Sequence, residues 1–223
     1  DSELNAVELS NLYYDADIVD YANPDLASLY YVLCETVPND SLFYGYGGYQ
    51  WSLNNKGPAW PGGSKWLDPM TSDADIDAVE AWDYETGNSD VIIAFIDTGI
   101  YLAHEDLRDN LWKNSDEIPD NGIDDDNNGY VDDYGGWNFR NDSNDISPDY
   151  SSSAYPNGDP HGTRIAGIAA AVGNNGIGIA GVAWNCKIMP LVYSTIQSRT
   201  ADAIYYAVDN GARVINMSLR WFL

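Results

Sequence analysis

The feature that most constrains the fold is an apolar run, Val91–Ile96, which ends directly in Asp97, Thr98 and Gly99. A short, largely β-branched run of this kind is typical of a strand buried on both faces of a parallel sheet. In such sheets, ligands and catalytic groups gather at the carboxyl ends of the strands. An isolated buried carboxylate is costly, so Asp97 is expected to have partners there, either as part of a site or as a loop or helix cap.

The rest of the chain alternates strands and helices around an acidic, loop-rich segment at residues 113–160. The apolar periodicity predicts strands at 187–192 and 213–219 and helices at 77–83, 162–172 and 201–210, the last one ended by Gly211. Strands that alternate with helices favour an α/β fold, in which helices cover both faces of a parallel sheet.

The charge balance excludes two classes of partner. The chain has 35 acidic and 10 basic residues and a formal net charge of −25, whereas nucleic acids and anionic membranes are bound by clustered Lys and Arg. No apolar stretch reaches the roughly 20 residues of a membrane-spanning helix. The acidic excess is either a solvated surface or, in part, a set of cation ligands that relieve the mutual repulsion.

A second motif, His161 to Gly167, begins the predicted helix of small residues. Histidine is the side chain that exchanges a proton near neutral pH, which suits a general base. A buried structural histidine is the alternative. The chain has two histidines, and the other, His104, lies in a predicted loop.

Together these motifs resemble the aspartate and histidine blocks of the subtilases. Four blocks follow in family order, at residues 97–100, 161–167, 174–183 and 214–219. The resemblance implies a subtilisin-like fold, incomplete on its C-terminal side, and a serine endopeptidase that cleaves peptide or protein substrates through an acyl-enzyme. It gives Asp97 the role of orienting the imidazole, and His161 that of taking and returning the serine proton. Ser218 and Leu219 would offer backbone groups to the substrate strand.

Two parts of the family pattern do not occur in these residues. There is no Gly-Thr-Ser block for the nucleophile and no segment with the oxyanion-hole Asn, and Arg220 and Trp221 stand where the family has small residues. We therefore expect the 223 residues to be inactive as written. A non-catalytic calcium- or peptide-binding protein is the alternative. An aspartic protease, whose motif also begins Asp-Thr-Gly, is disfavoured because the motif occurs once and leaves His161 unused.

The acidic segment 124–133 has the spacing of a calcium loop, with Gly129 at the sharp turn. The predicted oxygen ligands are Asp124, Asp126, Asn128, the Tyr130 carbonyl and Asp132, with Asp133 as a substitute for the absent last ligand. A solvated acidic run is the alternative. The resemblance implies a second Ca²⁺ site, formed by Asp106, Asn175, Gln50 and the carbonyls of Gly173, Ile177 and Ile179.

The resemblance also divides the chain. Residues 1–36 resemble the tail of an inhibitory propeptide, 37–90 a mature N-terminal segment and linker, and 91–223 the N-terminal part of a catalytic domain. An extension that stays attached is the alternative for the first part. The protein is expected to be secreted, with its own propeptide as a partner and its signal peptide outside this sequence. Residues 37–41 are expected to be an exposed linker. Cys34 and Cys186 form either a disulfide or two buried thiols.

Overall fold

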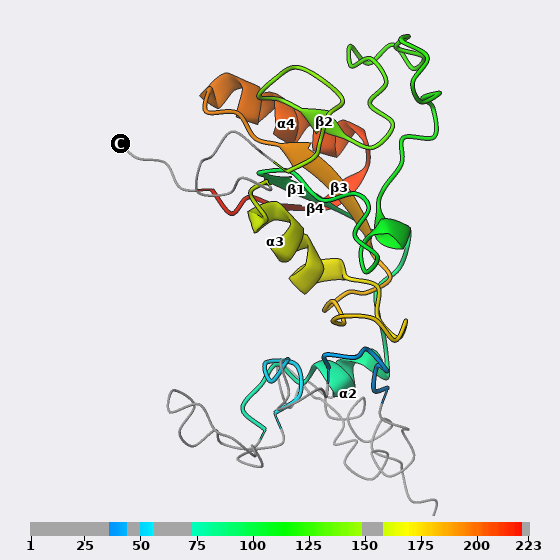
Figure 1. Cartoon of the computed structure of the whole chain (residues 1–223), viewed down its shortest axis with the longest axis vertical. Coiled ribbons are helices and arrows are strands. Elements are labelled where there is room, and N and C mark those ends of the chain that lie inside the picture. The colour runs from blue at the N-terminus through cyan, green and yellow to red at the C-terminus, as the bar shows by residue number, and fades with distance from the viewer. Residues whose placement is uncertain (1–35, 44–49, 56–72, 149–157, 220–223) are drawn as a thin grey trace, which may run out of the picture. The chain divides into compact units, whose positions relative to one another are not determined.

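The computed structural model describes residues 36–43, 50–55, 73–148 and 158–219 (Figure 1). The chain divides into two compact units, 1–36 and 37–223, and all the described helices and strands belong to the second. Cys34 therefore lies outside the described residues, and Cys186 is buried as a free thiol. Within the described part of the chain, no helix is long and apolar enough to cross a membrane.

Four parallel strands form one sheet in the order β2-β3-β1-β4. They are β1 (Ile92–Asp97), β2 (Trp137–Asn138), β3 (Lys187–Val192) and β4 (Ala212–Asn216). The central strand β1 pairs with β3 over its whole length and with β4 on its other side. Among the described residues β4 has no second neighbour, so its outer edge is open.

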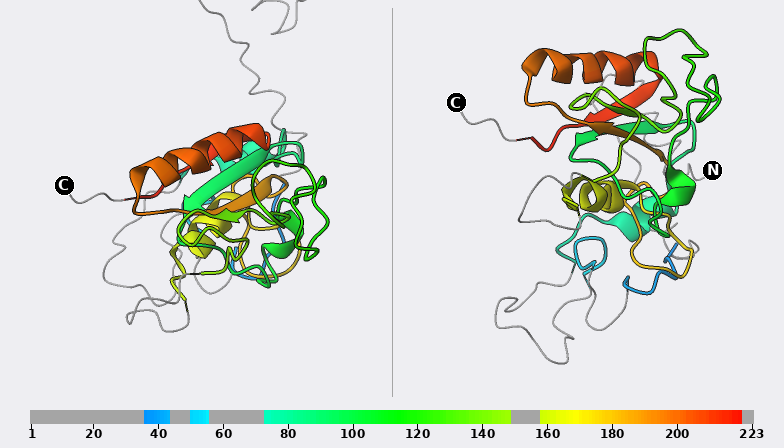
Figure 2. Two further views of the ribbon diagram at one scale, coloured as in Figure 1. Left: turned by 90° about the horizontal axis from the view of Figure 1, so that it is seen from above. Right: turned by 45° about the horizontal axis from the view of Figure 1, so that its top comes forward.

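The two long helices, α3 (His161–Ala170) and α4 (Gln197–Asp209), cover opposite faces of this sheet (Figures 1 and 2). A short helix, α2 (Ala78–Trp82), precedes β1, and a 3₁₀ turn, η2 (Arg108–Asn110), follows it. The predicted α/β class, with helices on both faces of a parallel sheet, is confirmed.

The side chains of β1 alternate between two cores. Ala94 and Ile96 pack in the cluster that contains the α4 residues Ala203, Tyr206 and Ala207, whereas Ile93 and Phe95 pack with Ala166 and Ala170 of α3. Ala94, Phe95 and Ile96 are at most 1% exposed. Burial of a large apolar side chain contributes about 1.5–3 kcal/mol to the free energy of folding. The apolar side chains on both faces of β1 therefore stabilise it as a central strand.

Two boundaries differ from the predicted ones by three residues or more. α4 begins at Gln197 rather than at 201, because its polar first turn finds local partners: the Thr200 hydroxyl donates to the Ser194 carbonyl at 2.8 Å. β4 ends at Asn216 rather than at 219, which leaves Ser218 and Leu219 beyond the strand.

The prediction of an exposed linker at residues 37–41 is wrong in part. Pro38 and Asp40 are buried, and the segment leads into Phe43, which joins a third core cluster. In that cluster Trp82 of α2 stacks on Trp184, with ring centroids 4.5 Å apart. The segment is therefore part of the packed unit.

Candidate active site

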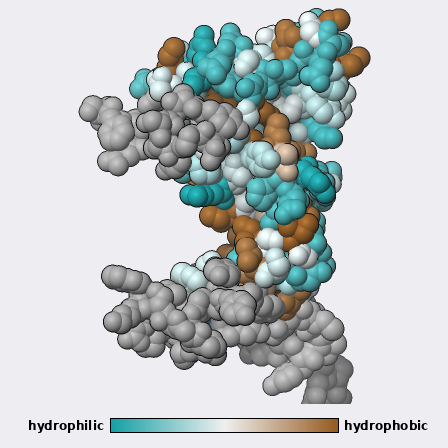
Figure 3. Space-filling model, viewed as in Figure 1, coloured by the Kyte–Doolittle hydropathy of each residue, from teal (hydrophilic) through white to brown (hydrophobic). Residues whose placement is uncertain are grey.

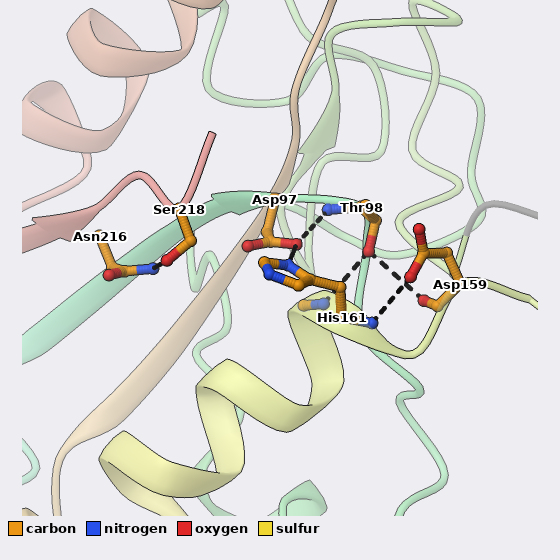
Figure 4. A network of polar contacts seen from close by, with 7 residues as sticks. Asp97, Thr98, Asp159, His161, Asn216 and Ser218 are labelled. Atoms are coloured by element: carbon orange, nitrogen blue, oxygen red, sulfur yellow. Dashed lines mark hydrogen bonds and ion pairs between the residues drawn. The ribbon is translucent and has the colours of Figure 1, made fainter. Parts of the chain in front are cut away.

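Asp97, the last residue of β1, is buried with its side chain 1% exposed. Its Oδ1 atom accepts a hydrogen bond from the Thr98 amide at 2.7 Å and lies 2.7 Å from Nδ1 of His161 (Figure 4). Its Oδ2 atom has no hydrogen-bond partner among the described residues. The chain thus places a carboxylate at the carboxyl edge of the sheet and pairs it with one imidazole.

His161, the first residue of α3, has a side chain that is 46% exposed. Its backbone amide donates to Oδ1 of Asp159 at 3.0 Å, and the next amide, that of Gly162, donates to the Thr98 hydroxyl at 3.1 Å. These bonds fix the start of α3 against the end of β1 (Figure 4). Because a carboxylate only accepts, Nδ1 donates to Asp97, and Nε2 is left to exchange a proton.

Close backbone approach explains the glycine after the histidine. A Cβ atom at Gly162 would clash with the Gly99 carbonyl oxygen and would lie 3.1 Å from Oδ1 of Asp97. Gly99 has a φ of +101°, in the region that favours glycine. Gly162 therefore allows the histidine helix to approach the aspartate strand, and Gly99 allows the turn that follows the strand.

The predicted substrate residues lie just after β4. The Ser218 hydroxyl accepts a hydrogen bond from the Asn216 side-chain amide at 3.1 Å, and Leu219 packs partly buried against the core cluster of α4. Because the strands are parallel, this segment follows the same carboxyl edge as Asp97. Their binding role remains a prediction.

Three carboxylates meet in the acidic loop: Glu117, Asp124 and Asp126 each place one oxygen within 4.8 Å of the others. Glu117 is 4% exposed, and its Oε1 accepts the amides of Asp125 and Asp126 at 2.7 and 3.2 Å. Its Oε2 has no hydrogen-bond partner among the described residues. The loop spacing predicted Asp124 and Asp126 but missed Glu117, which stands outside segment 124–133.

The other predicted ligands of this loop lie differently. Asn128 adjoins the cluster, since its Nδ2 donates to Oδ2 of Asp126 at 3.0 Å and its Oδ1 accepts the Tyr130 amide at 2.8 Å. The Asp132 carboxylate instead accepts the amides of Asn121 and Gly122, at 2.9 and 3.0 Å. Backbone donors thus contact both oxygens of Asp132.

Asp133 anchors the loop to the core. It is 0% exposed and accepts hydrogen bonds from the side-chain amides of Asn114 and Asn128, both at 3.0 Å, and from the Tyr206 hydroxyl at 2.6 Å. Burial, reinforced by the bond to Asp133, raises the pKa of the Tyr206 hydroxyl far above its ordinary value, so it donates at every physiological pH. Protein donors therefore occupy both Asp133 oxygens.

Replacing Tyr206 by Phe is expected to lower the free energy of unfolding by about 1–3 kcal/mol, because a buried carboxylate loses its donor. The matched control is Tyr205→Phe, at a neighbouring tyrosine that is 69% exposed. Denaturant unfolding measures both variants. Equal stabilities would show that the bond from Tyr206 to Asp133 does not hold the loop.

The second predicted calcium set is partly assembled. Asp106, 2% exposed, accepts the Asn175 side-chain amide on Oδ1 at 3.0 Å and the Ile179 amide on Oδ2 at 2.9 Å. Asn175 also accepts the Ile177 amide at 2.7 Å, and Gly173 belongs to the same loop. Gln50 lies beside this loop, with both side-chain amide atoms bonded to the backbone of Ala180 at 2.7 and 2.8 Å.

A buried carboxylate that the sequence interpretation missed adjoins this loop. Asp40 is 3% exposed; its Oδ2 accepts the Asn174 amide at 2.6 Å, and its Oδ1 has no hydrogen-bond partner among the described residues. Burial raises the pKa of the Asp40 carboxyl, and the nearby charge of Asp106 acts in the same direction. In the sequence, the only hint of this contact was an aspartate within the segment that was predicted to be a linker.

Comparisons with known proteins agree with this arrangement. A thermophilic serine proteinase of Bacillus sp. strain AK1 is 33% identical over 207 residues, which is 91% of this chain and 37% of the proteinase. An extracellular protease of Xanthomonas campestris pv. campestris is 37% identical over 166 residues, 67% of this chain and 27% of that protein. The chain thus spans well under half the length of these relatives.

The solved structure of the Aeromonas sobria serine protease in complex with its chaperone ORF2 shares the fold, with a TM-score of 0.50 and 24% identity. The matched region covers 78% of this chain and 25% of the Aeromonas sobria chain. The sequence model of the subtilase family matches residues 88–220, more than half of the chain and both members of the Asp97–His161 pair. The chain therefore belongs to the subtilase family.

Proposed function

We propose that this chain contributes the aspartate and histidine of a secreted, calcium-dependent serine endopeptidase of the subtilisin type. The observation that carries the proposal is the 2.7 Å contact between Oδ1 of buried Asp97 and Nδ1 of exposed His161, at the carboxyl edge of a parallel sheet. Family membership supports the same reaction class, peptide-bond hydrolysis.

In the proposed reaction, the Asp97 carboxylate holds the His161 ring in one tautomer and stabilises its charged form. Nε2 of His161 takes the proton of a serine hydroxyl and later returns it to the leaving amine. That serine is proposed to lie outside these 223 residues, since no Gly-Thr-Ser block occurs among them. Ser218 and Leu219 are proposed to pair with the substrate backbone as an added strand.

Ca²⁺ is the proposed cofactor, and two donor sets fit it. Glu117, Asp124 and Asp126 form one, in which Oε2 of Glu117 is buried, has no hydrogen-bond partner among the described residues and can serve as a hard oxygen ligand. Asp106 and Asn175 belong to the other, together with Asp40, whose Oδ1 is also buried and unpartnered. When bound, the ion supplies positive charge that offsets the repulsion of these carboxylates and ties their loops together.

Replacing Glu117 by Gln is expected to weaken Ca²⁺ binding by about tenfold or more, because the change removes a buried charged ligand. The matched control is Asp116→Asn, which removes an equal charge from the exposed neighbour. Isothermal titration with Ca²⁺ measures both. An unchanged affinity in Glu117→Gln would exclude this cluster as a calcium site.

The leading segment, residues 1–36, is proposed to be the tail of a propeptide that binds the same protein. The Aeromonas sobria protease was solved with a chaperone, so a fold of this kind accommodates a protein partner. Secretion is proposed because a relative is named an extracellular protease. Nucleic acids and anionic membranes are not proposed as partners, given the net charge of −25.

The decisive experiment is to sequence the gene beyond the codon for Leu223 and to express the product of the continuous reading frame. A product that contains a Gly-Thr-Ser block and hydrolyses peptides in a reaction blocked by a fluorophosphonate supports the endopeptidase. A stop codon directly after Leu223 and a folded product that binds Ca²⁺ would instead support a non-catalytic calcium- or peptide-binding protein.

A further inference from the structure

A hollow at the opposite end of the sheet gathers positive charge. Its cavity volume is about 570 Å³, and it lies where β1 and β3 begin. Three cationic side chains line it, those of Arg108, Lys113 and Lys187, together with one carboxylate, that of Asp109. The whole chain has only ten Lys and Arg. At a rise of about 3.3 Å per residue, β1 separates the hollow from Asp97 by about 17 Å, so the hollow is not part of the candidate active site.

The two ammonium groups are not neutralised locally. Nζ of Lys187 donates to the Asp109 carbonyl at 2.8 Å, and Nζ of Lys113 lies 5.5 Å from the centre of the Tyr134 ring. In the described part of the chain, neither forms an ion pair with a carboxylate. Arg108 faces Asp109 at 3.5 Å, but both side chains are well exposed and their interaction is weak.

Besides these charged residues and Ser89, the lining is apolar and comes from Ile92, Leu111 and Trp112. A volume of about 570 Å³ falls in the range of sites for organic ligands and exceeds the needs of one inorganic ion. A ligand that matches this lining carries several carboxylates beside an apolar group. Figure 3 shows mostly hydrophilic residues over α4, and the chain has a net charge of −25, so a cluster of three cations is a local exception to its acidic composition.

We propose that this hollow is a docking site for an acidic peptide segment of a partner or substrate protein, separate from the catalytic edge. Carboxylates of the peptide pair with Arg108, Lys113 and Lys187, while an apolar side chain between them contacts Trp112. At physiological ionic strength, charges beyond about 8 Å are screened, so the three cations of the lining act against one lining carboxylate, Asp109, and not against the net charge of the whole chain. The cations select acidic sequences, and the apolar lining distinguishes a peptide from a bare anion.

The test titrates the 223-residue chain by calorimetry with an end-blocked peptide, Asp-Leu-Glu-Asp, and with its neutral counterpart, Asn-Leu-Gln-Asn. We expect the acidic peptide to bind, to weaken as salt is raised, and to lose about tenfold in affinity in the double variant Arg108→Gln/Lys113→Gln. Both side chains are exposed, so the variant is expected to fold, and circular dichroism checks this. The control Arg164→Gln removes one exposed cation near His161 and is expected to bind normally.

Several outcomes would overturn the proposal. They are the absence of binding at millimolar peptide, equal binding of the neutral peptide, an unchanged affinity in the double variant, and a loss confined to Arg164→Gln. Inorganic phosphate that competes as strongly as the peptide would show a simple anion site instead. Because the readout is binding and not hydrolysis, the result is independent of the proposed peptidase activity.

Discussion

The 223 residues alone are expected to show no detectable hydrolysis of a peptide substrate, with turnover about a million-fold below that of a chain that also supplies the serine. Asp97 and His161 form a dyad, but the family's serine block does not occur among these residues, so the dyad has no nucleophile to activate. Of the serines near the end of the chain, Ser194 is buried and accepts the Ile196 amide, and Ser218 is bonded to Asn216. A fluorogenic peptide assay measures the rate.

The control for this experiment is the product of the continuous reading frame, assayed at the same concentration. Circular dichroism and a Ca²⁺ titration establish that the shorter chain is folded, so that a missing activity is not a missing fold. Hydrolysis by the 223 residues that a fluorophosphonate blocks would contradict the prediction, because it requires a serine nucleophile among them.

In a chain that carries the serine block, Asp97→Asn is expected to lower kcat by about four orders of magnitude. The change leaves the volume of the side chain nearly the same but replaces the acceptor of the Nδ1 hydrogen bond. An amide nitrogen facing the ring favours the tautomer with its proton on Nε2, which cannot accept the serine proton. The loss therefore appears in kcat, whereas KM changes little.

The matched control is Asp90→Asn, an exposed aspartate that precedes β1 at the opposite end of the strand. It removes the same charge without touching the dyad and is expected to keep full activity. If Asp97→Asn retained more than about a tenth of the wild-type kcat, the carboxylate would have no part in orienting His161, and the triad assignment would fail.

Patterns dominated by burial were predictable from the sequence. The run Val91–Ile96 predicted β1, and β3 spans the predicted residues 187–192, because both faces of these strands are apolar. The contact between Asp97 and His161 was expected from the resemblance to the subtilase aspartate and histidine blocks, and burial alone does not specify it.

Long-range polar contacts were not predictable from spacing. Asp40 and Asn174 are 134 residues apart in the sequence and meet only in the fold. Asp132 fits the calcium-loop spacing, and its contacts with the amides of Asn121 and Gly122 could not be read from that spacing. Glu117 was missed because it stands outside the spaced segment 124–133.

The open edge of β4 has a practical consequence for anyone who purifies this chain. Among the described residues its outer backbone groups are unpaired, and next to Val214 at 51% and Met217 at 38% exposure they are a template on which another molecule's strand can add. Concentrated samples would then contain dimers joined edge to edge, whose share grows with concentration. Dilute handling, or a lysine introduced into that strand, keeps the molecules apart.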